Sequence, residues 1–89
     1  MDNLLFQAIR VVVTPGVLNL LSKRKISKLL KRHMQGDWGD LCEDDKEIYD
    51  RALLEGGRVL SSFTTSKGTV WITTDANRLT TTVLLPSEY

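Results

Sequence analysis

Apolar and polar residues alternate at both ends of the chain with the two-residue period of β-strands. Residues 8–13 are rich in β-branched side chains and place Ile9, Val11 and Val13 on one face, which predicts a first strand. Three more strands are predicted in the last third of the chain, at residues 58–65, 69–74 and 79–85. Turn sequences separate these three: Ser66-Lys67-Gly68, with a glycine for positive φ, and residues 75–78. The last three strands are therefore expected to form an antiparallel meander.

Helical periodicity fills the stretch between the first strand and the meander. Thr14 suits a helix cap and Pro15 the first helical position, because the missing N–H of proline has no partner there. Residues 25–35 repeat apolar side chains at spacings of three and four, which predicts an amphipathic helix with Gly36 as its C′ residue. The pattern leaves open whether these are two short helices or one bent helix.

A further helix is predicted at residues 43–54. Its first turn is acidic, and negative charge is stabilising at the N-terminal end of the helix dipole. Either Asp40 or Cys42 is the N-cap, and Asp40 would form a capping box with Glu43. Leu41, Ile48 and Ala52 are expected to face inward, with Tyr49 and Leu53 as further candidates.

These elements predict a single α+β domain over residues 1–89. An N-terminal strand is followed by two to three helices and then by a three-stranded antiparallel meander packed on the helices, with residues 1–7 as a loose lead-in. A chain of 89 residues, 42% of them hydrophobic and 26% charged, has the size and composition of one globular core. Because there is one cysteine, no signal sequence and no apolar run of membrane-spanning length, a cytoplasmic location is expected.

Charge is segregated along the chain, although the formal net charge is only +1. A basic run precedes the acidic helix, so the molecule is expected to be dipolar. The basic residues are Lys23, Arg24, Lys25, Lys28, Lys31 and Arg32. They are candidates for binding the phosphate backbone of a nucleic acid. The alternative is a solvated helix face partly paired with the acidic helix, which the near-zero net charge and the lack of interleaved aromatic residues favour.

Catalytic chemistry has little support in the sequence. The one histidine, His33, lies on the apolar edge of its helix, and no nucleophile with an orienting third group accompanies it. We interpret His33 as a buried or interface residue and expect no enzymatic activity and no cofactor. The spacing of the acidic residues does not match a calcium-binding loop, so no metal site is expected.

Residues 36–41, Gly-Asp-Trp-Gly-Asp-Leu, join the basic run to the acidic helix. We interpret Trp38 as folded back onto the helices, with Asp37 and Asp40 accepting hydrogen bonds from N–H groups of the loop. The alternative is partner binding, because tryptophan is over-represented at interaction hot spots. The candidate partner-binding residues are Trp38, Asp37, Asp40 and Trp71.

The motif at residues 36–41, the Gly-Gly-Arg at 56–58 and the ending at 80–89, which closes in Leu-Leu-Pro-Ser-Glu-Tyr, carry a family resemblance. The chain resembles a family of small uncharacterised bacterial proteins encoded on plasmids, prophages and other mobile elements. The resemblance covers most of the chain from about residue 12 and implies a genomic setting rather than a mechanism. Two features depart from the family: Cys42 replaces an acid or small polar cap, and the second helix is more basic.

These observations predict a non-catalytic, cytoplasmic protein-interaction or regulatory module of a mobile genetic element. The partner is another protein or a second copy, which would form a homodimer through an exposed strand edge. One alternative is an accessory protein that binds nucleic acid through the basic helix at residues 23–32. Another, which only the implied setting suggests, is an inhibitor of a host defence system.

Overall fold

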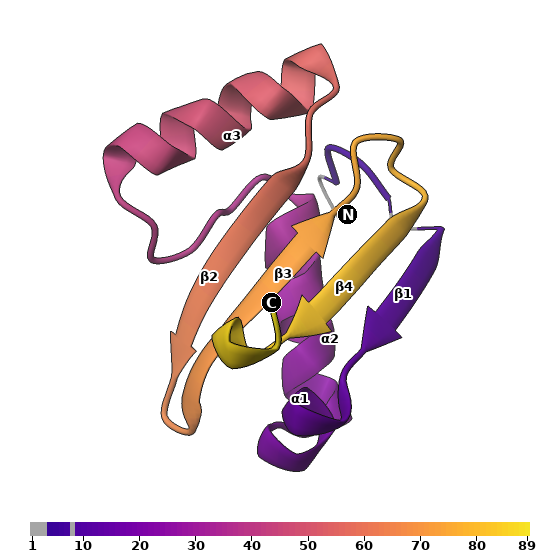
Figure 1. Ribbon diagram of the computed structural model, residues 1–89, viewed down its shortest axis with the longest axis vertical. Coiled ribbons are helices and arrows are strands. Elements are labelled where there is room, and N and C mark those ends of the chain that lie inside the picture. The colour runs from indigo at the N-terminus through magenta and orange to yellow at the C-terminus, as the bar shows by residue number, and fades with distance from the viewer. Residues whose placement is uncertain (1–3, 8) are drawn as a thin grey trace.

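The computed structural model describes residues 4–7 and 9–89, and it confirms the predicted α+β class. A strand and three helices precede a three-stranded meander (Figure 1). The elements are β1 (Arg10–Val13), α1 (Pro15–Leu20), α2 (Lys23–Met34), α3 (Glu43–Glu55), β2 (Val59–Thr65), β3 (Gly68–Thr74), β4 (Thr80–Leu84) and the 3-10 helix η1 (Pro86–Glu88). None of the helices among the described residues has the length and apolarity that a membrane crossing requires.

The four strands form one mixed sheet in the order β1-β4-β3-β2. The meander is antiparallel throughout, as predicted, whereas β1 lies parallel to β4 with Val11 opposite Thr81. The first strand thus joins the sheet, at an edge. Residue 8, the predicted start of this strand, lies outside the described residues.

One face of the sheet carries the hydrophobic core. Helix α2 lies behind the sheet in Figure 1 and covers this face, and α1 lies at the lower end of the sheet and adds Val17 to the core. The buried core residues are Val17, Leu21, Ile26, Phe63, Val70, Ile72 and Val83. They come from both helices and from three strands, so the core forms only when distant segments of the chain meet.

The basic run begins a separate helix rather than continuing α1. Thr14 caps α1 through a hydrogen bond from the N–H of Val17, and Pro15 follows it, as predicted. The chain is extended at Leu21, and the hydroxyl of Ser22 then accepts a hydrogen bond from the N–H of Lys25, which starts α2. The open alternative is therefore resolved as two helices, because Ser22 supplies a second N-cap.

Part of the N-terminal lead-in is anchored. The N–H of Leu5 donates to the carbonyl oxygen of Met34 at 2.8 Å, and the ring of Phe6 lies edge-on to His33 at 5.4 Å between ring centroids. Leu5 and Phe6 thus extend the packing around the end of α2. Residues 1–3 of that segment lie outside the described residues.

The structure resolves the N-cap of α3. The N-cap is Cys42, without a side-chain hydrogen bond, so the alternative of a capping box between Asp40 and Glu43 does not apply. Asp40 instead accepts a hydrogen bond from the N–H of Thr64 on β2 at 2.7 Å.

The prediction that Ile48 faces inward is wrong. Ile48 is 58% exposed, because α3 packs through the neighbouring stripe that contains Tyr49. No residue of α3 is fully buried, so the attachment of this helix depends on partly buried side chains and on its contacts to Trp38.

The loop at residues 36–41 runs along the outer edge of β2. The N–H of Ser62 donates to the carbonyl oxygen of Trp38 at 3.1 Å, and the N–H of Asp40 donates to the carbonyl oxygen of Ser62 at 2.7 Å. Gly39 forms a parallel bridge with Ser62 at this point and has a φ of +75°. The loop thereby satisfies backbone groups of an edge strand that would otherwise be free to pair with another chain.

Two glycines with positive φ provide a matched test of this contact. Gly56 has nothing within 4 Å of an added Cβ, so Gly56→Ala should lower the free energy of unfolding by about 1–2 kcal/mol, the cost of the left-handed conformation. A Cβ on Gly39 would collide with the carbonyl oxygen of Ser62 and the ring of Phe63. Gly39→Ala should therefore cost substantially more in urea denaturation. Equal losses would show that the loop does not lie this close to β2.

Candidate functional site

Trp38 is at the centre of the contacts between α2, α3 and the loop. Its side chain is 2% exposed, and its indole N–H donates to Oδ1 of Asp50 on α3 at 2.8 Å. The ring lies edge-on to His33, at 5.6 Å between centroids, and 6.2 Å from the ring of Tyr49. A side chain buried in this way offers no surface to a partner, which agrees with the structural interpretation of Trp38.

The two aspartates of the motif also make internal contacts. Asp37 Oδ2 accepts from Nε of Arg32 at 2.7 Å, and its Oδ1 accepts from the N–H of Gly39 at 2.9 Å. Partial burial alone would raise the pKa of Asp37, but these two hydrogen bonds, together with the positive charges of Arg32 and Lys46, outweigh it and hold the pKa below its usual range. Asp40, as described above, accepts from β2. Both carboxylates thus fix the loop through internal hydrogen bonds, while each side chain keeps solvent-exposed surface.

His33 is fully buried and bonded at both ring nitrogens. Nδ1 lies 2.5 Å from Oγ of Ser61, and Nε2 lies 2.8 Å from Oγ1 of Thr74. The Ser61 hydroxyl donates to the carbonyl oxygen of Asp37 at 3.1 Å, and Thr74 lies 2.7 Å from the hydroxyl of Thr81. Ser61 donates its only hydroxyl hydrogen to Asp37, so its Oγ must act as the acceptor toward His33. The proton of the neutral imidazole is therefore assigned to Nδ1, which donates to Ser61.

This network keeps His33 uncharged. Burial lowers its pKa from 6.5 to about 3, and the positive charge of Arg78 contributes in the same direction. The guanidinium of Arg78 is itself fixed by the carbonyl oxygens of Gly57 at 2.7 Å and Ala52 at 3.2 Å. The prediction that His33 is a buried or interface residue is resolved in favour of burial, and the histidine is a polar centre of the core.

Ser61 and His33 are residue types found in nucleophilic catalytic centres, but their burial differs from that of such a centre. Ser61 and His33 are both 0% exposed, so no substrate reaches the hydroxyl in this conformation. Cys42 is exposed and lies at the start of α3, and among the described residues no hydrogen bond links it to this pair. In residues 4–7 and 9–89, no three histidine, cysteine, aspartate or glutamate side chains are arranged to hold a metal ion.

Trp71 lies on the opposite face of the sheet from His33. It is half-buried, and its ring is edge-on to that of Tyr89 at 5.5 Å between centroids. Nη1 of Arg58 donates to the hydroxyl of Tyr89 at 3.1 Å. Tyr89 is 65% exposed, so Trp71, Tyr89 and Arg58 together form a solvent-accessible group, which we call the aromatic patch.

The basic residues of α2 are all exposed: Lys23, Arg24, Lys25, Lys28, Lys31 and Arg32. Arg32 pairs with Asp37 and lies over the ring of Phe63 at 4.5 Å from the ring centroid. Among the described residues, no ion pair joins Lys25 or Lys28 to the acidic helix α3. The expected partial pairing of the two helices therefore does not involve these two lysines.

Sequence reasoning missed the polar partners of His33. Ser61 lies between Val59 and Phe63 on the inward face of β2, and an inward hydroxyl needs a hydrogen-bond partner. That alternation was a usable signal for a buried polar site. Nothing in the sequence indicated that the partner is a histidine 28 positions earlier.

Because His33 is buried in its neutral form, the folded protein should lose stability at pH values well above those at which ordinary carboxylates titrate. Between the folded pKa of about 3 and the unfolded value of 6.5, the unfolded state binds more protons. The contribution of His33 to the free energy of unfolding is therefore fully present above about pH 6.5 and is lost as the pH falls. From about pH 8 to about pH 5 the free energy of unfolding should fall by about 2 kcal/mol in urea titrations.

His33→Gln is the control for this effect. Without the titrating ring, the difference in unfolding free energy between the two pH values should shrink to about 0.5 kcal/mol or less. The working range lies above the pH at which Asp37 and Glu88 titrate, since both have a lowered pKa. An equal loss in wild type and variant would show that His33 is not the group responsible.

No family model matches the chain, and no curated protein or solved structure matches it either. The resemblance to small proteins of mobile elements therefore stays a prediction. The function has to be argued from the two surfaces and the buried network described above.

Proposed function

We propose that this chain is a non-catalytic protein-interaction module that binds its partner through the aromatic patch. The observation that carries the proposal is the grouping of Trp71, Tyr89 and Arg58 on an accessible face of the sheet. Tryptophan, tyrosine and arginine are the residue types that contribute most at protein interfaces. Each is held by a contact to another, so little side-chain entropy is lost on binding.

The surroundings of the patch support a flat docking surface. Among the described residues, only those of the short η1 lie in front of β3 and β4 on this face of the sheet (Figure 1). Around Trp71 the same face carries Ser62 and Leu84, which are its direct neighbours on the adjacent strands and are nearly buried. Accessible aromatic side chains that pack against well-packed neighbours are typical of the centre of an interface.

The buried network supports a non-catalytic role. The nucleophile and base that the structure brings together, Ser61 and His33, have no exposed surface, and the imidazole is neutral and bonded at both nitrogens. Their contacts account fully for their burial as core polar groups. The groups that the chain exposes, such as those of the aromatic patch, are therefore suited to binding.

The resemblance to mobile-element proteins adds a setting to this proposal. We infer a regulatory role in the bacterial cytoplasm, with a protein of the element or of its host as the partner. A component of a host defence system is one such partner. Self-association is expected to use the free edge of β1, where Ile9 is 79% and Val11 45% exposed, since such an edge can pair with another strand.

The proposal predicts that truncating the patch removes binding. Immobilised wild-type protein should retain a partner from lysate of its host, and Trp71→Ala and Tyr89→Ala should each weaken retention at least about tenfold. Tyr89→Ala guards against misfolding, because the side chain is mostly exposed. Light scattering of the complex then distinguishes a second copy from a different protein.

Leu54→Ala is the matched control, because Leu54 is 87% exposed on α3, outside the patch. It should leave retention unchanged. A strict monomer that retains nothing, or equal retention by the patch variants and wild type, would contradict the proposal.

A further inference from the structure

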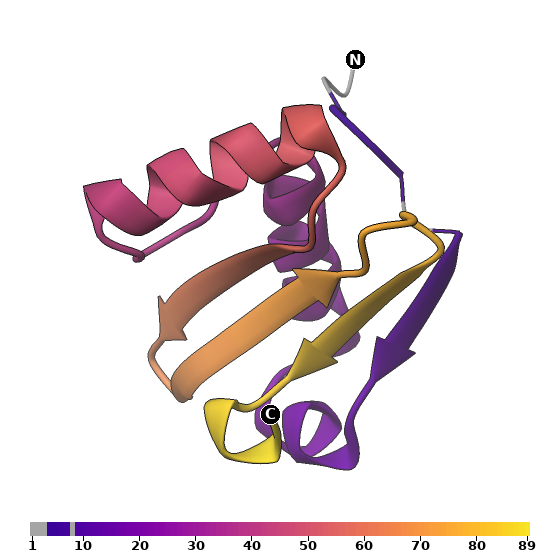
Figure 2. The same cartoon turned by 45° about the horizontal axis from the view of Figure 1, so that its top comes forward.

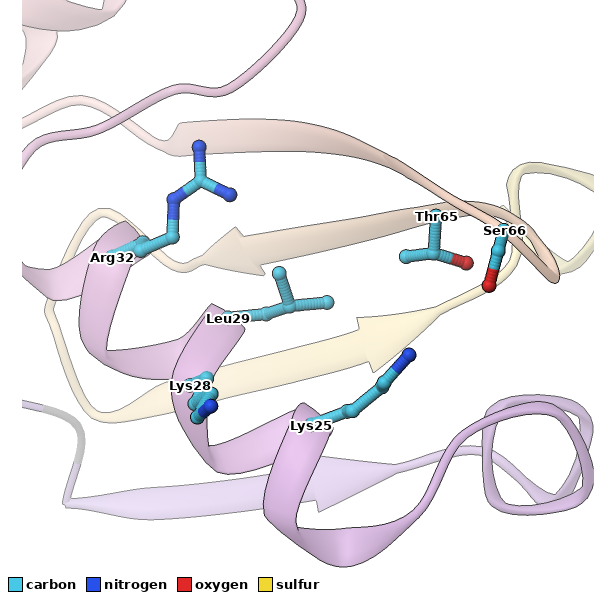
Figure 3. Close-up of a pocket in the computed structure, with 6 residues that line it drawn as sticks. All are labelled: Lys25, Lys28, Leu29, Arg32, Thr65 and Ser66. Carbon is cyan, nitrogen blue, oxygen red and sulfur yellow. The ribbon is translucent and has the colours of Figure 1, made fainter.

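A groove with a volume of about 300 Å³ lies between α2 and the hairpin that joins β2 to β3 (Figure 3). Its lining residues are Lys25, Lys28, Leu29, Arg32, Thr65 and Ser66. In Figure 3 the side chain of Lys25 extends from the helix toward Ser66, and Leu29 lies between the basic side chains. The groove is thus apolar at its centre and positively charged around it.

The charge of the groove follows from the helix period. Positions 25, 28 and 32 are separated by three and four residues, so the helix places three cations on one face. Arg32 is paired with Asp37 on its far side. Among the described residues Lys25 and Lys28 have no ion-pair partner, and like charges at this spacing repel each other. An anionic ligand would remove that repulsion.

The hairpin supplies the opposite side of the groove. Ser66 and Lys67 form its two-residue tip, and both are exposed. The tip is braced by Thr65, whose hydroxyl donates to the carbonyl oxygen of Gly68 at 2.7 Å and accepts from the N–H of Lys67 at 3.1 Å. The braced hairpin therefore places the side chains of Thr65 and Ser66 beside the helix, on the opposite side of the groove.

The acidic residues do not neutralise this region. In Figure 2, as in Figure 1, the hairpin lies at the end of the sheet opposite to α3, where most of the carboxylates are. The net charge of +1 therefore conceals a positive end formed by α2 and the hairpin. A local positive field attracts polyanions even when the total charge is small.

We propose that this groove binds the backbone phosphates of a nucleic acid. The exposed cations continue along α2 on both sides of the groove, and a helix of 12 residues is about 18 Å long. That length spans about five phosphates along one strand of a duplex, which fits a polymer better than a single small anion. Lysine, arginine and serine side chains are the usual phosphate contacts.

The groove favours a duplex, bound without sequence preference. Binding of single strands depends on aromatic side chains that stack on bases, and Phe63, the aromatic ring beneath Arg32, is 1% exposed. The binding face lies across the sheet from Trp71, since α2 covers the face opposite the aromatic patch. This inference is therefore independent of the proposed protein partner.

The test is fluorescence anisotropy with a labelled duplex of about 20 base pairs, titrated between about 50 and 200 mM salt. Wild type should bind, with an affinity that falls steeply as salt rises. The double variant Lys25→Gln/Lys28→Gln should bind about tenfold more weakly or worse at the lowest salt, and the slope of log affinity against log salt should decrease by about two.

The double variant Arg10→Gln/Arg51→Gln is the control, because it removes the same charge from exposed positions on β1 and α3. It should keep both the affinity and the slope close to wild type. Amide signals of Thr65, Ser66 and Lys67 should shift in NMR spectra when the duplex is added.

Several results would overturn the inference. They are no binding at about 50 mM salt, binding that is independent of salt, an equal loss in the control variant, and unmoved hairpin amides. Tighter binding to vesicles of anionic lipid, or to an acidic peptide, than to the duplex would also overturn it.

Discussion

Trp38 contacts α2, α3 and β2, and it joins α3 to the other two elements. The indole lies edge-on to His33 on α2 and its N–H donates to Asp50 on α3, while the backbone carbonyl oxygen of the same residue accepts from the N–H of Ser62 on β2. Since α3 has no fully buried residue of its own, this side chain is the main apolar link between that helix and the rest of the molecule. The position of the loop, the cover over the edge of β2 and the orientation of α3 all depend on it.

Beneath the indole, the domain places a polar network where a larger protein would place only apolar side chains. His33, Ser61 and Thr74 are fully buried, and each satisfies its hydrogen-bonding groups within the network. Such a network fixes a unique arrangement when complete and is costly when one member is lost. Because it packs α2 firmly on one face of the sheet, the opposite face and the outer side of α2 are left as two separate surfaces for binding.

Much of the fold could be predicted from local sequence, and the failures have local causes. The β-branched runs gave the strands, and Ser66-Lys67-Gly68 gave the hairpin. The inward face of α3 was assigned wrongly at Ile48, because the helix is rotated toward the stripe of Tyr49 by contacts to Trp38 that the sequence does not reveal. The candidate sites were harder, since His33 meets Thr74 across 41 positions and the groove joins α2 to a hairpin formed much later. Both the histidine network and the groove depend on how distant segments of the chain are aligned in the fold.

The central claim is that Trp38 holds the helices, the loop and the sheet together, and its direct test is the free energy of unfolding of Trp38→Ala beside Trp38→Phe. The alanine variant should lose about 3–5 kcal/mol, the cost of removing a buried aromatic side chain. The phenylalanine variant keeps most of the packing and should lose less, about 1–2 kcal/mol, for the hydrogen bond to Asp50. A loss of about 0.5 kcal/mol or less in the alanine variant would place the indole at the surface and contradict the claim.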